Sequence, residues 1–169
     1  AVFILNTPVR QPNLIAETLV REELVVLAHP EHPLTKRDEV RPHELAGSEV
    51  FLMTEAGCTY RALFEHSLAE AGVHPETVLE FGSVEAFKQC LMAGMGIGVL
   101  PRMAVRAELE AGRAAAIPWT PPLEPVLTQM VIHKDKWISP ALAALMRTAR
   151  EVLVGPAAPT PGSAQSSPS

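Results

Sequence analysis

The sequence has 169 residues, of which 47% are apolar and 20% are charged, and its formal net charge is −5. This composition is typical of a globular chain with one domain or two small lobes. It excludes three classes: a transmembrane protein, because no apolar run reaches the ~18 residues that a bilayer span needs; a disulfide-rich scaffold, because there are only two cysteines; and a chain that wraps nucleic acid by itself, because that requires a basic face.

The two ends of the chain differ in character. The first residues enter an apolar run directly, with no Met and no export signal before it. We interpret this strand without a preceding partner as the start of a fragment. The last residues, 155–169, contain four Pro, four Ser and no charge, and we expect a disordered tail because they cannot bury enough apolar surface to offset the entropy of ordering.

Seven short apolar runs predict strands, and several are continuous, as is typical of strands that are covered on both faces. In chain order they are Ala1–Leu5, Glu22–Ala28, Glu49–Met53, Thr77–Phe81, Ile97–Leu100, Ala114–Trp119 and Val126–Ile132. Four amphipathic stretches predict helices between and after them. They are Thr59–Ala71, Val84 to the residue before Gly94 with Ser83 as cap, Arg102–Ala111, and Pro140–Leu153 with Ser139 as cap. This alternation predicts an α/β fold with mixed, mostly parallel sheets.

One long segment carries a family resemblance. Residues 81–102, FGSVEAFKQCLMAGMGIGVLPR, contain a polar helix start, a glycine-rich turn and an apolar strand that ends in Leu-Pro-Arg. This pattern resembles the effector-binding domain of LysR-type transcriptional regulators. Other segments agree with the family in order and spacing, and the ordered set is specific although each motif alone is weak. These segments are 22–34, 54–61, 111–113, 117–119 and 137–140.

The resemblance covers about residues 1–154 and implies a two-lobed fold like that of type II periplasmic binding proteins. It implies that residues 1–24 are a remnant of an incomplete lobe one, that 25–128 form lobe two and that 129–154 return to lobe one. It further implies a cytoplasmic sensor of a small, anionic effector, without cofactor, metal or enzymatic activity. Such a sensor forms a homodimer or homotetramer and acts on DNA through an amino-terminal helix-turn-helix domain that this sequence lacks.

Ligands of such folds bind between the lobes, at the carboxyl ends of strands and the amino ends of helices. Free N–H groups there favour anions. We therefore expect effector contacts from two segments of lobe two and from the end of the first strand. The expected residues are Asn6, Thr7, Thr54, Thr59, Arg61, Ser83, Val84 and Glu85. Two alternatives stay open, because Thr59 and Ser83 can cap helices without a ligand and Arg61 can form a salt bridge.

Other motifs favour structural roles. The run Gly94–Gly98 follows a helix and enters a strand, which is the reverse of the dinucleotide-binding order, so we expect a tight turn. His29 and His32 lie in a proline-rich loop with no third ligand nearby in sequence, which argues against a metal site. Cys90 fits a core position.

Two further functions compete with the regulator. A solute-binding protein of a transport system has the same fold, and the sequence upstream of Ala1 distinguishes it, because a signal peptide replaces the helix-turn-helix domain. A cysteine enzyme or a redox sensor requires Cys58 to be activated at its helix start. His66 lies two helical turns away from Cys58, too far to take the thiol proton. If Cys58→Ser leaves a measured turnover unchanged, the enzyme is excluded.

Overall fold

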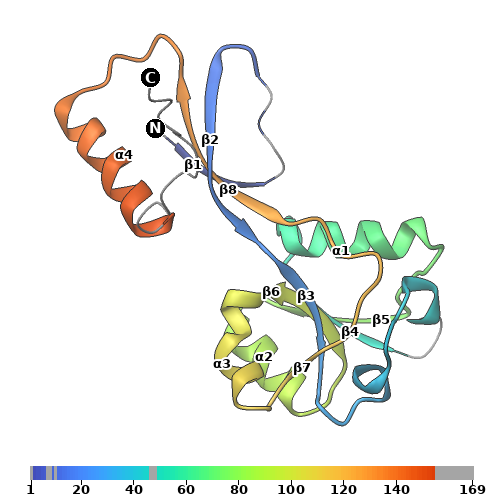
Figure 1. Ribbon diagram of the computed structural model, residues 1–169. Helices are drawn as coiled ribbons and strands as arrows, with labels where there is room; N and C mark the ends of the chain where they lie inside the picture. The colour runs from blue at the N-terminus through green and yellow to red at the C-terminus, as the bar shows by residue number, and fades with distance from the viewer. Residues whose placement is uncertain (1, 7–8, 10, 46–48, 155–169) are drawn as a thin grey trace, which may run out of the picture.

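The computed structural model describes residues 2–6, 9, 11–45 and 49–154 (Figure 1). A smaller sheet has the strand order β1-β8-β2, and both of its pairings are antiparallel. Its strands are β1 (Val2–Asn6), β2 (Leu14–Glu22) and β8 (Val126–His133). Helix α4 (Pro140–Leu153) packs against β2 through Met146 and Ala149.

A larger sheet has the order β5-β4-β6-β3-β7. Its strands are β3 (Leu24–Ala28), β4 (Val50–Thr54), β5 (Thr77–Phe81), β6 (Ile97–Pro101) and β7 (Ala115–Ala116). Strand β4 is parallel to β5 and β6, whereas β3 is antiparallel to β6 and β7. The helices of this part are η1 (Pro33–Lys36), η2 (Pro42–Leu45), α1 (Thr59–Glu70), α2 (Val84–Met92), η3 (Arg102–Val105) and α3 (Arg106–Glu110).

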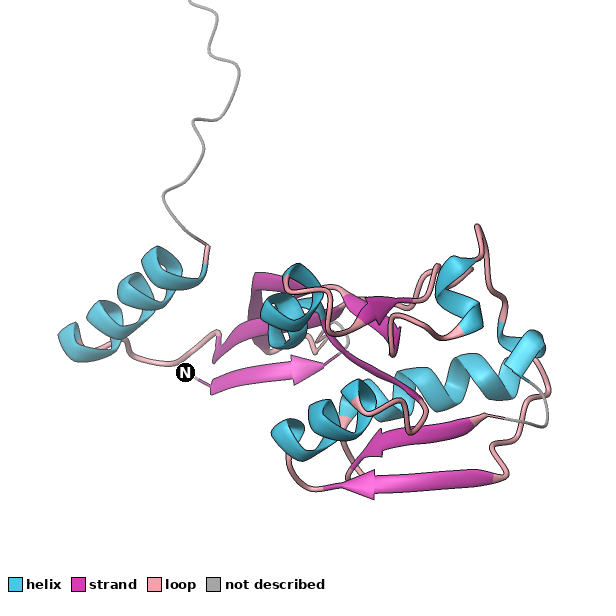
Figure 2. Cartoon of the chain, turned by 90° about the horizontal axis from the view of Figure 1, so that it is seen from below, coloured by secondary structure: helices cyan, strands magenta, loops and turns pink. Residues whose placement is uncertain are grey.

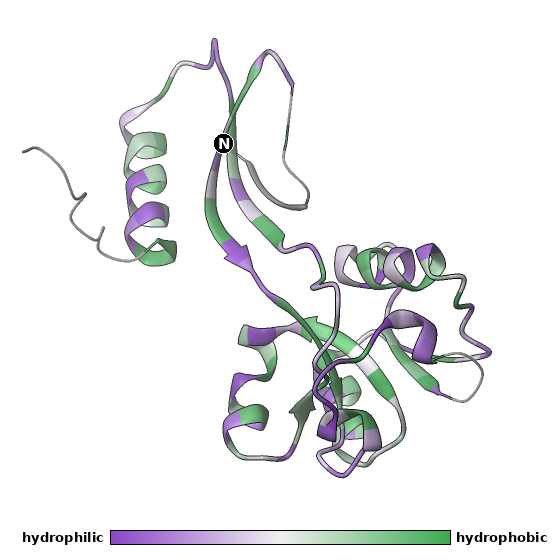
Figure 3. Cartoon of the chain, turned by 45° about the vertical axis from the view of Figure 1, so that its right-hand side comes forward, coloured by the Kyte–Doolittle hydropathy of each residue, from purple (hydrophilic) through white to green (hydrophobic). Residues whose placement is uncertain are grey.

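The larger sheet is covered on both faces, which explains its continuous apolar strands. Along β3, alternate residues belong to different clusters, because successive side chains of a strand point to opposite faces. Val26 packs with α1 residues such as Phe64, whereas Leu27 packs with α2 residues such as Phe87. Figure 3 shows these strands in green, while the outer turns of the surrounding helices carry much of the purple.

Local sequence signals set the helix ends. Ser83 and Ser139 both cap their helices, accepting hydrogen bonds from the N–H groups of Ala86 and Leu142. Gly94 ends the turn after α2 with φ of +74°, a conformation that glycine adopts at little cost. Gly96 has no room for a side chain, because an added Cβ would lie 2.1 Å from the carbonyl oxygen of Val50 on the neighbouring strand.

The chain passes between the two sheets where β2 runs on into β3 and again between β7 and β8 (Figures 1 and 2). Only Glu23 separates β2 in the smaller sheet from β3 in the larger one. The chain returns to the smaller sheet through β8, which pairs with β2 up to Glu22↔Val126. This arrangement gives two lobes, and we call the junction where β2 passes into β3 the hinge.

Four sequence-based expectations need correction. Pairing is not mostly parallel, since four of the six ladders between described strands are antiparallel, because the crossing strands enter both sheets against their neighbours. Strand β2 begins at Leu14, in a segment with no predicted strand. The predicted strand 114–119 is reduced to β7, and the predicted helix 102–111 divides into η3 and α3. The expected tail, 155–169, lies outside the described residues.

Candidate functional site

One edge of the larger sheet collects most of the predicted site. Strands β4, β5 and β6 are parallel, so their last residues lie at the same edge, with Thr54 opposite Phe81 in the register. Leu24 pairs with Pro101, which brings the hinge to this edge as well. We call this edge, with the loops that leave it, the interlobe edge.

The first loop of the interlobe edge leads from Thr54 into α1. Gly57 turns the chain with φ of +90°. Cys58 is the N-cap and makes no side-chain capping bond, so Thr59 is the first helical residue and the expectation that Thr59 caps the helix is wrong. The Thr54 hydroxyl is buried and has no hydrogen-bond partner among the described residues. A buried hydroxyl without a partner is costly, which marks this position as a candidate ligand contact.

Arg61 already has protein partners. Its guanidinium donates to the Thr54 carbonyl oxygen at 3.0 Å and to the Glu65 carboxylate at 2.7 Å, and it also pairs with Glu80 of β5. The hydrogen bonds to Glu65 and Glu80 raise the pKa of Arg61. The salt-bridge alternative therefore describes this structure, with Arg61 joining α1 to the ends of β4 and β5.

The second loop leads from β5 into α2. Ser83 is exposed and accepts the Ala86 N–H at 3.4 Å, and Val84 is 43% exposed. The Glu85 side chain forms an ion pair with Lys88 one turn further along α2, with its Oε1 at 2.6 Å from the Lys88 Nζ. Ser83 and Val84 thus face solvent at the interlobe edge, whereas the carboxylate of Glu85 is held by a cation.

The smaller sheet supplies less of the predicted site. Asn6 is the last residue of β1 and pairs with Leu127 of β8, so it lies at the end of its strand as expected. Thr7 lies outside the described residues. The positions of Asn6 and Thr7 in a ligand site therefore stay predictions.

Two consecutive glutamates at the hinge were not among the predicted site residues. Glu22 accepts hydrogen bonds from the Tyr60 hydroxyl of α1 at 3.2 Å and from the Thr128 hydroxyl of β8 at 2.8 Å. Burial, together with the Glu22 carboxylate, raises the pKa of Tyr60 to about 12. Glu23 instead binds Arg102, whose Nε and Nη2 donate to its two carboxylate oxygens at 2.7 and 2.9 Å.

Arg102 and Glu23 are also joined through the backbone, since the Arg102 N–H donates to the Glu23 carbonyl oxygen at 2.8 Å. The side-chain bonds lower the pKa of Glu23. The sequence signal for this pair is faint: two acidic residues stand directly before the apolar run 24–28, and an arginine follows the apolar strand of the Leu-Pro-Arg segment. Nothing in the sequence indicates that they meet.

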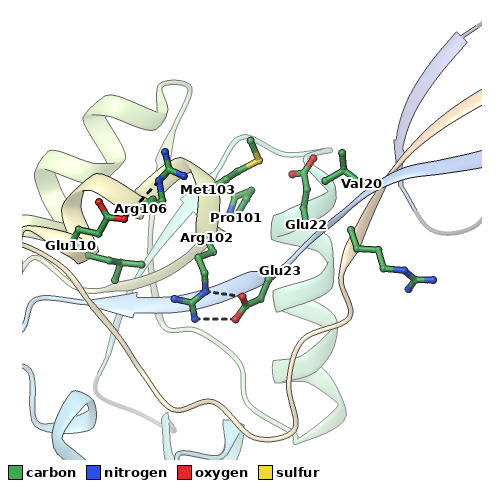
Figure 4. A pocket seen from close by; sticks show the side chains of 10 residues that line it. Val20, Glu22, Glu23, Pro101, Arg102, Met103, Arg106 and Glu110 are labelled. Carbon is green, nitrogen blue, oxygen red and sulfur yellow. Dashed lines mark hydrogen bonds and ion pairs between the residues drawn. The ribbon is translucent and has the colours of Figure 1, made fainter. Parts of the chain in front are cut away.

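A cavity of about 630 Å³ opens beside this pair (Figure 4). We call it the hinge cavity. Its walls combine apolar and charged side chains from β2, from the end of β6 and from the helices that follow. The lining residues are Val20, Arg21, Glu22, Glu23, Pro101, Arg102, Met103, Arg106, Leu109 and Glu110. A volume of this size is typical of small-molecule sites.

None of the described histidines and cysteines lines the hinge cavity. His32 contacts Glu49 at 3.2 Å, and no cluster of three metal-binding side chains occurs among the residues that the structure describes. Cys58 starts α1, whereas Cys90 packs in the cluster on the opposite face of the sheet, and both are free thiols. His66 contacts Glu70 at 3.4 Å. In the described part of the chain, no helix has the length and apolar character needed to cross a membrane.

Comparison with known proteins identifies the family. Residues 2–154 match the family model described as the LysR substrate binding domain. An uncharacterized HTH-type transcriptional regulator of Bacillus subtilis (strain 168), YwqM, is 42% identical over 149 residues, which are 88% of this chain and 50% of that protein. The HTH-type regulator CbbR of Rhodospirillum rubrum is 34% identical over 149 residues, with 86% and 47% covered. The chain spans about half the length of these relatives.

Solved structures share the fold. The regulatory domain of CcmR from Synechocystis PCC6803, in complex with 2-PG, superposes with a TM-score of 0.76 at 24% identity over 89% of this chain and 72% of that one. The effector-binding domain of QuiR, in complex with shikimate, gives 0.67 at 19% identity over 89% and 71%. The fold, the ordered motifs and the match over residues 2–154 agree, and the chain therefore belongs to the LysR substrate-binding domain family.

Proposed function

We propose that this chain is the effector-sensing part of a bacterial LysR-type transcriptional regulator, and that it binds a small anionic ligand at the interlobe edge. The main support is the register of β4 and β5, which brings the starts of α1 and α2 to one edge. Helix starts carry free N–H groups and the positive end of the helix dipole, which favour an anion. The Thr54 hydroxyl, which has no hydrogen-bond partner among the described residues, adds a donor beside them.

The expected site residues differ in the part they play. Ser83, Val84 and Thr59 lie at helix starts, where an anion can accept N–H bonds. Arg61 orients the first loop by holding the Thr54 carbonyl oxygen, and Glu85 disfavours a second negative charge nearby. On the opposite lobe, Asn6 and Thr7 complete the proposed site.

The regulatory step is a shift between lobe arrangements. In this proposal, residues 1–24 and 129–154 belong to one lobe and 25–128 to the other. A ligand can shift the equilibrium only by the difference in its affinity for the two arrangements. The shift would reach DNA in the cytoplasm through a helix-turn-helix domain and a homodimer or homotetramer of the full-length regulator. The ligands named for CcmR and QuiR, 2-PG and shikimate, support a small polar effector. The named relatives are regulators, which supports a sensor rather than an enzyme.

Calorimetric titration of the full-length gene product tests the proposal, with sulfate, amino acids and small carboxylates as ligands. The sharpest comparison is Ser83→Ala against Ser139→Ala. Both serines cap a helix through an N–H bond, at 3.4 and 3.2 Å, so both variants lose about 1 kcal/mol of helix stability. Only Ser83→Ala should weaken the binding of the anion, by about tenfold. Tight binding of a neutral compound, together with no response to any anion, refutes the proposal.

A further inference from the structure

We propose that the hinge cavity is a second ligand site, separate from the helix starts, and that it takes a carboxylate with an apolar body. None of the residues expected to bind the effector lines this cavity. The proposal rests on the composition of its walls and on the Arg102–Glu23 pair.

The walls of the hinge cavity suit an amphipathic ligand. Val20, Pro101, Met103 and Leu109 provide an apolar surface. Met103 is 71% exposed, so a bound apolar group would remove it from water. The gain in affinity comes mainly from this burial, as in other small-molecule pockets.

Arg102 provides the polar end of the site. Its guanidinium already holds a carboxylate, that of Glu23, in the two-pronged geometry that guanidinium groups favour. A ligand carboxylate can take the place of Glu23 with the same number of hydrogen bonds. The exchange costs little, because both side chains are about half exposed, at 47% and 62%, and exposed ion pairs contribute little stability.

The other charges of the cavity are less suited to this role. Arg106 lies 3.9 Å from Glu110, one turn away on the same helix, and both side chains are more than 70% exposed. Glu22 accepts hydrogen bonds from Tyr60 and Thr128. Arg21 lies on β2, in register with Leu127 of β8, and unlike Arg102 it holds no carboxylate among the described residues.

Binding at Arg102 would act on the hinge directly. Glu23 is the residue between β2 and β3, and its side chain is attached to lobe two through Arg102 alone among the described residues. A ligand that displaces Glu23 releases this attachment and leaves the backbone bond between the two residues. Binding of a carboxylate at this site would therefore loosen the segment in which β2 passes into β3.

Titration calorimetry on the full-length gene product tests this site with phenylacetate, 3-phenylpropionate and hexanoate, and with 3-phenylpropanol as the uncharged match. Arg102→Gln should lower the affinity for the carboxylates at least tenfold and leave the affinity for the alcohol unchanged. Arg102→Lys keeps the charge but cannot form the two parallel hydrogen bonds of a guanidinium. Its affinity for the carboxylates should lie between those of the unaltered protein and of Arg102→Gln. Glu23→Gln removes the competing carboxylate and should tighten binding about threefold. Arg21→Gln, the control arginine of the same cavity, should change the affinity less than twofold.

If the ligand exchanges with Glu23, Arg102→Gln lowers the affinity for carboxylates and Glu23→Gln raises it. If the pair has only a structural role, both variants lower the affinity. Weaker binding in Glu23→Gln, equal losses in the two arginine variants, or no carboxylate binding up to about 10 mM each overturn the inference. Thermal melts identify any variant that fails to fold. Sulfate, which has no apolar body, should bind Arg102→Gln as tightly as the unaltered protein, so failure of the hinge-cavity site and failure of the proposed anion site can be told apart.

Discussion

Lys88 of α2 and Glu108 of α3 form an ion pair in which both side chains are only 10% exposed, with Nζ and Oε1 3.1 Å apart. The pair joins the helix that starts at Ser83 to the helix that lines the hinge cavity. Lys88 also binds Glu85, whereas the second carboxylate oxygen of Glu108 is buried and has no hydrogen-bond partner within the described part of the chain. The two glutamates raise the pKa of Lys88, and Lys88 lowers that of Glu108.

Removing one member of this pair should cost more than removing both. Lys88→Met leaves the buried Glu108 carboxylate with Arg113, at 3.8 Å, as its one cationic neighbour among the described residues, and should destabilise the chain by about 2 kcal/mol. Glu108→Leu should cost less, because Lys88 keeps Glu85 as a partner. The double variant should recover most of the loss. Urea unfolding measures all three, and additive losses would contradict a coupled pair.

Tyr60 should titrate near pH 12. It is the single tyrosine of the sequence, so the absorbance difference between the protein and its Tyr60→Phe variant reports this group directly. Burial and Glu22 raise the pKa from 10.0 to about 12, so the stability that this group contributes is present below pH 10 and is lost as the pH rises toward 12. Glu22→Gln should lower the midpoint. A titration midpoint near pH 10 in the folded protein would show that Tyr60 is not bonded to Glu22 at the hinge.

Acid should weaken the contact between β2 and α4. Two guanidinium nitrogens of Arg150 donate to the Glu17 carboxylate, at 2.8 and 2.7 Å, and these bonds lower its pKa below 4.5. A carboxyl group with a lowered pKa contributes stability that is present above pH 4.5 and is lost as the pH falls through its folded value. In Glu17→Gln, the melting temperature should therefore fall less steeply with pH below pH 4.5 than in the unaltered protein.

Glu124→Gln is the control for the acid experiment, because Glu124 has no ion-pair partner in the described part of the chain. It should keep the slope of the unaltered protein. Equal slopes in both variants would show that the Glu17–Arg150 pair does not contribute to acid stability.

Gly96 should be intolerant of a side chain. In Gly96→Ala, the new Cβ meets the Val50 carbonyl carbon and oxygen, which belong to the backbone of the adjacent strand and cannot turn away. We expect a loss of at least about 2 kcal/mol, measured by thermal or urea unfolding. Gly82→Ala has nothing within 4 Å of the added Cβ and should change the stability little. Similar losses in the two variants would contradict the close approach of β4 and β6.

The sequence predicts the elements that depend on local signals. Ser139 followed by Pro140 begins α4, and Ser83 begins α2, as expected. Strand β2 escapes prediction because its pattern mixes charged residues such as Glu17 and Arg21 with apolar ones, and its pairing with β8 joins residues more than 100 positions apart. Antiparallel pairing at the hinge depends on the same distant contacts.

The candidate site divides along the same line. The loops at Thr54 and Ser83 are found from the sequence because a strand end and a helix start are local features. Glu23 and Arg102 are 79 residues apart in sequence, and only the antiparallel register of β3 and β6 brings them together. The partners of Arg61 and Glu85 are likewise set by side-chain geometry, which periodicity does not describe.

Hydrogen exchange with mass spectrometry on the full-length gene product, with and without the tightest anion from the titrations, tests the anion site most directly. We expect the ligand to slow exchange in peptides that cover residues 54–61 and 82–85, at the interlobe edge, while peptides of α4 keep their rates. Slower exchange in α4, with unchanged rates in both loops, would contradict the account.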